Sequence, residues 1–311
     1  MNQGLFIIGT DFAEGCESVS PDSVGDRSVS WEKSIRGFGP WEPVLLNGPG
    51  GTTRLKAWRS MCYSGPETVF ICGECTSTMD VVKKMTSLGL LKAWDSVISV
   101  FQTAGRGQHG RTWESLGGNL FSSWLWPPFD KSLDPAGRWA NMASLLAGGA
   151  IADFLATIGV SVEIKWPNDL LYHGKKLCGI LVEDFSGLLV TGIGINIKSA
   201  PGENSFYGRG AIPATSLLAA GKTFSPLELW LDILSAGKSF YSHMTRHAGP
   251  DFFIKWLEAR LAWKGARVVI RELPEGEIAA RISGLAPDGG LEISRNGQAE
   301  TLYNGRIFQV D

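Results

Sequence analysis

The residues best suited to chemistry in this sequence lie in a short run rich in glycine and arginine. The run reads G-R-G-Q-H-G-R-T-W from Gly105 to Trp113, and it contains Arg106 and Arg111. Backbone N–H groups in such a loop, together with two guanidinium groups, can bind a phosphate or a carboxylate. An exposed basic loop without a ligand is an equal alternative on composition alone.

The same run matches the glycine pattern of nucleotide-binding folds, but its context excludes them. Gly105, Gly107 and Gly110 fit G-x-G-x-x-G. A dinucleotide-binding fold requires a helix directly after these glycines and an acidic residue about 20 positions later. This chain instead continues through Trp113 and Gly117 into another strand-like run, and the kinase triplets H-R-D and D-F-G do not occur.

A second chemical feature is a lysine at the start of an apolar strand. The run I-K-W-P-N-D ends at Asp169, and after a short turn Lys176 opens K-L-C-G-I-L. A half-buried ammonium group there can act as a point charge on a phosphate during transfer. An ordinary strand-start lysine is the alternative, which the carboxylate of Asp169 and the cationic loop make weaker.

A third feature is a strand that contains two glycines, Gly192 and Gly194, and ends at Asn196. Glycine inside a strand often marks the place where a ligand or another backbone comes close. Tight packing is the alternative.

A mixed α/β body is expected to position these groups. Thr68 to Cys72 is β-branched and apolar, as in a buried strand. The hydroxyls of Ser77 and Thr78 then suit a helix N-cap, and Asp80 favours the first helical turn. Further strands are expected at 97–102, 119–126, 162–165, 170–172, 176–183 and 188–197, and further helices at 135–158, 214–220, 226–247 and 250–261.

The two ends of the chain differ from this body, residues 66–263. Residues 1–65 are rich in Gly, Ser, Pro and Asp, and they are expected to form an irregular extension of unknown role, with short strands near 5–8 and 43–46. Residues 264–311 alternate short strands with Pro, Gly and Asn turns, a pattern typical of a small β-barrel or of a sheet that packs against its neighbour.

Charge and hydropathy exclude several classes of partner. The 29 Lys+Arg and 31 Asp+Glu give a net charge of −2, so the overall charge does not favour binding to nucleic acid or to an anionic membrane. No helix-turn-helix pattern is visible. The longest apolar stretch, from Met142 to Val160, is interrupted by Asp153 and is too short to span a bilayer. The N-terminus does not resemble a signal peptide, and a cytoplasmic protein is expected.

The five cysteines agree with that location, because their number is odd and they are scattered. Cys72 and Cys75 form a C-x-x-C, so zinc binding and redox chemistry have to be weighed. A structural zinc site needs four ligands, and no second pair at matching spacing exists. Buried thiols without a function are the stronger interpretation.

Taken in order along the chain, these motifs resemble the signatures of biotin protein ligases. That family has a Ser-Thr pair opening a helix, followed by Q-x-A-G-R-G-x-x-G-R-x-W, K-W-P-N-D, K-L-x-G-I-L and G-x-G-I-N. The resemblance covers about residues 66 to 311, and the corresponding residues are Ser77-Thr78, Gln102 to Trp113, Lys165 to Asp169, Lys176 to Leu181 and Gly192 to Asn196.

The resemblance implies a fold and an activity. The fold is of the α+β class, with a mixed sheet and flanking helices like a class II synthetase, followed by a small Src-homology-3-like β-barrel. The activity is that of a biotin–[acetyl-CoA-carboxylase] ligase, which uses ATP, biotin and Mg²⁺. Biotin is activated to biotinyl-5′-AMP and then transferred to a lysine of a biotin carboxyl carrier domain. A homodimer is left open.

The resemblance also assigns residues to these ligands. Lys176 and Arg106 are expected to be catalytic, and Asp169 is the candidate Mg²⁺ ligand. The expected biotin-binding residues are Ser77, Thr78, Met79, Gln102, Gly105, Arg106, Gly107, Gln108, Lys176 and Gly179. The expected ATP-binding residues are Arg111, Trp113, Asn168, Asp169, Gly194 and Asn196.

Two departures and two alternatives accompany this hypothesis. Gln108 stands where many family members have a second arginine, so adenylate retention could be weaker, and Cys178 replaces a commoner alanine. A lipoate or octanoate ligase of the same superfamily is one alternative function. A non-catalytic regulator that binds biotin or a nucleotide is the other, and it is disfavoured because Arg106, Asp169 and Lys176 are all retained.

Overall fold

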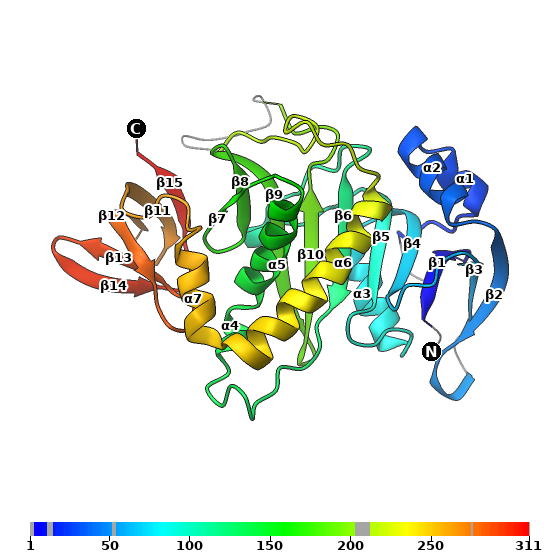
Figure 1. Ribbon diagram of the computed structural model, residues 1–311, viewed down its shortest axis with the longest axis horizontal. Helices are drawn as coiled ribbons and strands as arrows, with labels where there is room; N and C mark the ends of the chain where they lie inside the picture. The colour runs from blue at the N-terminus through cyan, green and yellow to red at the C-terminus, as the bar shows by residue number, and fades with distance from the viewer. Residues whose placement is uncertain (1–2, 11–14, 52–53, 203–211, 275, 311) are drawn as a thin grey trace. The chain divides into compact units, whose positions relative to one another are not determined.

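The computed structural model describes residues 3–10, 15–51, 54–202, 212–274 and 276–310, whose elements are labelled in Figure 1. The chain forms two units, each described below by itself. Unit 1 comprises Met1–Pro128, Ile180–Ala200 and Ser216–Ser235, and unit 2 comprises Phe129–Gly179, Pro201–Thr215 and Ala236–Asp311. The expected body, 66–263, is thus shared by both units, and the expected division into three domains stays a prediction.

Unit 1 is built on a mixed sheet, as expected. The pairs β1–β4 and β4–β5 are parallel, whereas β1–β3, β2–β3, β5–β6 and β6–β10 are antiparallel. The strand order is β2 (Trp41–Asn47), β3 (Arg54–Ser60), β1 (Gly4–Ile8), β4 (Thr68–Cys75), β5 (Ser96–Gln102), β6 (Leu120–Leu125), β10 (Leu188–Ile195) and then β9 (Lys175–Phe185), which begins in unit 2.

Helix α3 (Thr78–Ser87) is the crossover between the parallel strands β4 and β5 and packs on β5, β6 and β10. Ser77 is its N-cap, as the sequence predicts, with extended backbone and a hydroxyl that accepts the N–H of Met79 at 3.4 Å. This cap places Ser77 and Thr78 at the end of the sheet where β4 and β5 both finish.

The described part of residues 1–65 is more regular than expected: the two short strands predicted at 5–8 and 43–46 are confirmed within β1 and β2, and two helices and a further strand accompany them. Strand β1 is completely buried between β3 and β4, so it lies inside the sheet. The Ser, Pro and Asp content that suggested loops instead provides helix caps: Ser20 caps α1 (Pro21–Gly25), and Ser28 caps α2 (Val29–Gly37). In Figure 1 these elements and strands β1 to β3 form the blue part of the chain.

Unit 2 contains a short antiparallel edge and a buried helix. Strand β8 pairs with β7 and with the first half of β9, placing Asp169 opposite Gly179. Helix α5 is apolar on nearly all sides, which explains its burial. The elements are α4 (Arg138–Asn141), α5 (Ala143–Thr157), β7 (Glu163–Lys165), β8 (Asp169–Tyr172), α7 (Pro250–Glu258) and the end of α6 (Pro226–His243), which is followed by a π-helix at Met244–Ala248.

Two expected helices differ from the structure. The helix predicted at 135–158 starts only at α4, because Gly137 has a left-handed φ of 69° and the Asp134 carboxylate accepts the N–H of Trp139 at 2.8 Å. The helix predicted at 214–220 does not form. Thr215 instead donates its N–H to the Lys176 carbonyl at 2.9 Å, so this segment pairs with β9 and then turns.

The C-terminal strands form an open sheet. Its order is β14-β13-β12-β11-β15, and every recorded pair is antiparallel. Within the described part of residues 264–311, β14 and β15 do not pair, so the sheet is not closed into a barrel, and the antiparallel strand order is consistent with the expected Src-homology-3-like domain. Closure requires paired edge strands, and here both edges are short. The strands are β11 (Arg267–Leu273), β12 (Gly276–Leu285), β13 (Leu291–Arg295), β14 (Gln298–Leu302) and β15 (Arg306–Gln309).

Among the residues described, no helix combines the length and the hydropathy that a bilayer crossing needs.

Candidate active site

The structure brings together the hydroxyl and amide groups expected to bind biotin in unit 1. The Oε1 atom of Gln102, at the end of β5, accepts the Thr78 N–H at 2.8 Å and the Thr78 hydroxyl at 3.2 Å. The Thr78 hydroxyl also lies 2.7 Å from the Oγ of Ser123 on β6. All of these side chains and that of Ser77 are buried. The result is a set of hydrogen-bonding groups at the N-terminus of α3, in which Ser123 was not anticipated.

The glycine-rich loop follows directly after Gln102 and folds back on itself. Gly107 donates its N–H to the Arg111 carbonyl at 2.7 Å, and Trp113 donates to the Gly105 carbonyl at 2.8 Å. Arg111 also reaches back, with its Nε 3.0 Å from the Gln108 carbonyl. The loop is therefore a closed hairpin, with the Arg111 side chain exposed and Gln108 close to its tip.

Arg106 is held by two acidic side chains that the sequence reasoning did not include. Its Nη2 lies 2.9 Å from Oδ1 of Asp80 on α3 and 3.7 Å from Oε2 of Glu183 on β9. Glu183 also forms an ion pair with Lys83. The guanidinium expected to clamp an anion is thus engaged with protein carboxylates, and a ligand anion has to compete with them. The sequence contains a signal for Asp80: it lies three residues after the Ser77 cap, in the first turn of α3, and therefore close to the expected site.

The strand glycines of β10 accommodate side chains of the protein itself. A Cβ atom at Gly194 would lie 2.3 Å from Cε2 of Trp113, and one at Gly192 would lie 2.8 Å from Sδ of Met79. The Trp113 indole therefore lies directly over Gly194, and Met79 lies against Gly192. This close approach explains both glycines without a ligand and joins the end of the glycine-rich loop to β10.

Replacing Gly194 by alanine is expected to displace the Trp113 indole. The added methyl would overlap a rigid ring, and overpacking of this kind costs about 1–3 kcal/mol of the free energy of unfolding. Urea unfolding at neutral pH measures this loss. Gly237→Ala on α6 is the matched control: its Cβ would lie 3.8 Å from Ala150 Cβ, an ordinary contact, so no loss is expected. Equal stability of Gly194→Ala and the wild type would contradict this packing.

Asn196, an expected ATP-binding residue, is buried and held by a neighbour. Asn119 donates from Nδ2 to the Asn196 Oδ1 at 3.4 Å. The Asn119 Oδ1 accepts the N–H groups of Ile197 at 2.9 Å and Lys198 at 3.0 Å. Asn119 thus fixes the turn after β10, and the binding role of Asn196 stays a prediction.

Unit 2 contains the expected lysine and aspartate, joined by a second lysine. Lys176 Nζ lies 2.7 Å from Oδ1 of Asp169, and Lys165 Nζ lies 3.1 Å from Oδ2. The exposed fraction is 9% for the Asp169 side chain and 8% for that of Lys165, but 29% for that of Lys176. Lys176 is therefore the more accessible of the two cations. The sequence analysis assigns no role to Lys165, although its position four residues before Asp169 in the same motif is a signal for this pairing.

The two lysines keep the carboxyl group of Asp169 ionised. Burial raises the pKa of its carboxyl group, but the ammonium groups of Lys176 and Lys165 outweigh burial and hold the pKa below its ordinary range. Asp169 is thus ionised at neutral pH. Asn168, in the preceding turn, donates its N–H to the Lys165 carbonyl at 3.2 Å, and Gly179 lies opposite Asp169 on β9.

The expected Mg²⁺ ligand does not fit a resident metal. Each carboxylate oxygen of Asp169 is already paired with an ammonium group. Across the described residues, no group of three or more His, Cys, Asp or Glu side chains is arranged to hold a metal ion. A divalent cation on Asp169 would have to displace two lysines.

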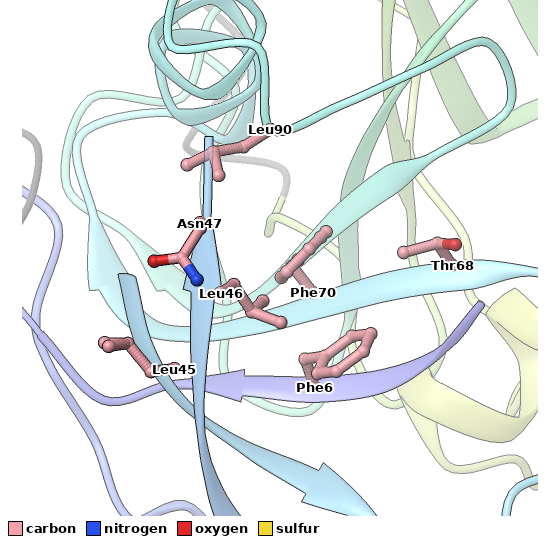
Figure 2. A pocket seen from close by; sticks show the side chains of 7 residues that line it. All are labelled: Phe6, Leu45, Leu46, Asn47, Thr68, Phe70 and Leu90. Atoms are coloured by element: carbon pink, nitrogen blue, oxygen red, sulfur yellow. The ribbon is translucent and has the colours of Figure 1, made fainter. Parts of the chain in front are cut away.

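A pocket of about 220 Å³ in unit 1 is lined by other residues (Figure 2). Its walls are mostly apolar, with two polar side chains, Asn47 and Thr68. None of the expected site residues borders it, and it is not part of the candidate site. The lining residues are Phe6, Leu45, Leu46, Asn47, Thr68, Phe70 and Leu90.

Comparisons with known proteins agree with the motifs. Residues 72–199 match the Biotin/lipoate A/B protein ligase family. The chain is 36% identical over 227 residues to the bifunctional ligase/repressor BirA of Salmonella typhimurium, covering 71% of this chain and 68% of that protein. It is 32% identical over 216 residues to the biotin–[acetyl-CoA-carboxylase] ligase of Mycobacterium tuberculosis, covering 69% and 78%. The match spans only 40% of the BirA of Escherichia coli and 65% of that of Bacillus subtilis.

Solved structures of biotin protein ligases have the same fold. The Aquifex aeolicus enzyme in complex with biotin and ATP has a TM-score of 0.64 at 25% identity, covering 77% of this chain and 97% of that chain. The Leishmania major enzyme in complex with biotinyl-5-AMP has a TM-score of 0.52 at 28% identity, covering 76% and 98%. Since two relatives above 30% identity are matched over more than two thirds of their length, the chain belongs to the biotin protein ligase family.

Proposed function

We propose that the protein is a biotin–protein ligase that activates biotin with ATP and transfers it to a lysine of a biotin carboxyl carrier domain. The observation that supports this most directly is the buried, hydrogen-bonded group of Ser77, Thr78 and Gln102. The glycine-rich loop that contains Arg106 begins three residues after Gln102. The hydroxyls and the amide suit the polar ring of biotin, and the guanidinium suits its carboxylate.

In the first step, a carboxylate oxygen of biotin attacks the α-phosphorus of ATP. A new O–P bond forms, the bond to the bridging oxygen breaks, and pyrophosphate leaves with that electron pair. Negative charge accumulates around the α-phosphate, where a positioned cation is effective. Lys176 suits this task because it is the more exposed partner of Asp169. When its ammonium group turns toward phosphate, Lys165 still neutralises the carboxylate.

Arg106 begins this step bound to Asp80 and Glu183. An incoming carboxylate or phosphate exchanges with them for the same guanidinium, so ligand binding replaces one ion pair by another. These protein ion pairs are partly exposed and individually weak, so the exchange costs little free energy. Mg²⁺ enters with the phosphates of ATP, as part of the substrate.

In the second step, the amine of the carrier lysine attacks the carbonyl carbon of biotinyl-5′-AMP. An amide bond forms, the C–O bond to the phosphate breaks, AMP leaves, and the amine loses a proton to solvent. Water would hydrolyse the same anhydride, so the adenylate has to be shielded until the carrier arrives. The hairpin of residues 105–113, joined to β10 through Trp113, is the segment suited to that shielding.

Biotin-dependent exchange of ³²P-pyrophosphate into ATP tests this proposal, with lipoate in a parallel reaction. Exchange with biotin alone is expected. Exchange with lipoate alone would favour the lipoate ligase alternative, and no exchange with either acid, in protein that still binds biotin, would favour a regulator. A purified carrier domain with its acceptor lysine, and the same domain with that lysine replaced by arginine, then tests transfer by intact mass.

A further inference from the structure

Three buried thiols of unit 1 lie together outside the reaction described above. Cys16 is 4% exposed, and Cys72 and Cys75 are each 0% exposed. They belong to one apolar cluster that also contains Phe6 and Ile8. All three are free thiols in this structure. The C-x-x-C pair of the sequence thus acquires a third member from a segment almost 60 residues earlier in the chain.

The backbone geometry of one pair within this cluster suits a disulfide. Cys16 and Cys75 are opposite each other in an isolated antiparallel bridge. The flanking bonds run from Glu17 N–H to the Glu74 carbonyl at 2.8 Å and from Thr76 N–H to the Gly15 carbonyl at 2.9 Å. Cys16 and Cys75 are therefore a non-hydrogen-bonded pair, whose Cα atoms lie roughly 4.5 Å apart with the side chains close. Disulfides span Cα separations of about 4.4–6.8 Å.

Cys72 is not expected to take part in this disulfide. Its thiol is 3.6 Å from the Ile98 carbonyl, to which it donates. Hydrogen bonding to Cys16 and Cys75, together with burial, raises the pKa of Cys72 well above its ordinary value. Since the thiolate is the nucleophile in disulfide exchange, Cys72 remains a protonated neighbour at neutral pH.

We propose that Cys16 and Cys75 are a thiol–disulfide site, which a disulfide oxidant such as oxidised glutathione converts into a covalent bond between the N-terminal segment and the end of β4. One thiolate attacks a sulfur of the oxidant and releases a glutathione thiolate, leaving a mixed disulfide. The second cysteine, after losing its proton, attacks the protein sulfur and releases the second glutathione. Two protein thiols are oxidised, and one glutathione disulfide is reduced to two thiols.

Burial controls how fast this bond forms. The oxidant reaches these sulfurs only when the segment around Cys16 separates from β4, so oxidation is slow in buffer and faster at urea concentrations below the unfolding transition. Once formed, the bond closes a loop of roughly 60 residues, which restricts the unfolded chain and raises Tm by roughly 5 °C. It also secures the strand end two residues before Ser77. This inference does not depend on the proposed ligase activity.

The whole 311-residue chain with Cys62→Ser, which removes the exposed thiol, is the form to test. Reduced protein is incubated with oxidised glutathione, with and without low urea, then alkylated, digested with trypsin and mapped by mass spectrometry. The expected product is a crosslink between the Cys16 peptide and the peptide of Cys72 and Cys75, formed faster in urea, with a higher Tm that dithiothreitol reverses.

Single variants assign the bond to its two sulfurs. Cys72→Ser is expected to retain the crosslink and the Tm shift, whereas Cys16→Ser and Cys75→Ala each abolish both. Cys178→Ser, in unit 2, is the buried control and is expected to change neither. A Cys72–Cys75 bond within one peptide, a crosslink that is lost in Cys72→Ser, or no disulfide in folded protein after prolonged oxidation would each overturn the assignment.

Discussion

Replacing Lys176 by glutamine is expected to lower biotin-dependent ATP–pyrophosphate exchange by about 10²–10³-fold, the effect of removing one preorganised charge-stabilising group. Under the proposed function, Lys176 is the cation that meets the α-phosphate. The fold is expected to persist because the backbone of Lys176 holds the strand in place. The Lys176 carbonyl accepts the Thr215 N–H at 2.9 Å, and the Lys176 N–H donates to the Pro213 carbonyl at 2.7 Å. Initial-rate exchange and urea unfolding of the same preparation measure the two effects.

Lys175→Gln is the matched control for this prediction. Lys175 is the preceding residue on β9, but its side chain is exposed, so removal of the same charge there is expected to leave exchange within about twofold of the wild type. Full activity of Lys176→Gln would remove this lysine from the reaction. An equal loss in both variants would mean that net charge on the strand matters, and not the ammonium paired with Asp169.

Replacing Asp169 by alanine is expected to lower the free energy of unfolding by about 3–5 kcal/mol, the cost of breaking a buried ion pair by removing one partner. Lys176 is partly exposed and can turn to water, but Lys165 is 8% exposed and would be left without its carboxylate. The loss is measured by urea unfolding at pH 7. Asp153→Ala, on an exposed position of α5, is the control and is expected to change stability by less than about 0.5 kcal/mol.

A second variant separates charge from packing at this position. Combining Asp169→Ala with Lys165→Met also removes the buried cation that has lost this carboxylate, so much of the lost stability is expected to return. If the double variant is as unstable as Asp169→Ala, the carboxylate acts through something other than Lys165.

The pH dependence of this stabilisation follows from the lowered pKa of Asp169. A carboxyl whose folded pKa lies below its unfolded value, near 3.9, contributes stability above the unfolded pKa and loses it as pH falls through the folded one. The difference between wild type and Asp169→Ala is therefore expected to be equal at pH 8 and pH 5.5 and to shrink only below about pH 4. A difference that shrinks between pH 8 and pH 5.5 would contradict this assignment.

Local pattern predicted the elements whose signals lie within a few neighbouring residues. The hydroxyl at Ser77 predicts the start of α3, because an N-cap hydrogen bond spans only two or three residues. The run of apolar and β-branched residues from Thr68 predicts β4, because a buried strand consists mostly of such residues. Local pattern does not predict α1 and α2, because Ser, Pro and Asp favour turns as well as helix caps, and only the structure shows Ser20 and Ser28 as caps. The apolar residues of β1 predict a strand, but they do not predict that its neighbours in the sheet are β3 and β4.

By itself, the sequence determined the chemistry available to this protein: hydroxyl and amide groups at a helix start and a strand end, a glycine-rich loop with arginine, and a lysine and an aspartate on strands, in the order of biotin protein ligases. Only the tertiary structure decided which groups meet. It pairs Arg106 with Asp80 and Glu183, lays Trp113 over Gly194 and sets Cys16 opposite Cys75. These contacts depend on strand order and register, which arise from packing between segments far apart in the chain and leave no periodic trace in any one of them.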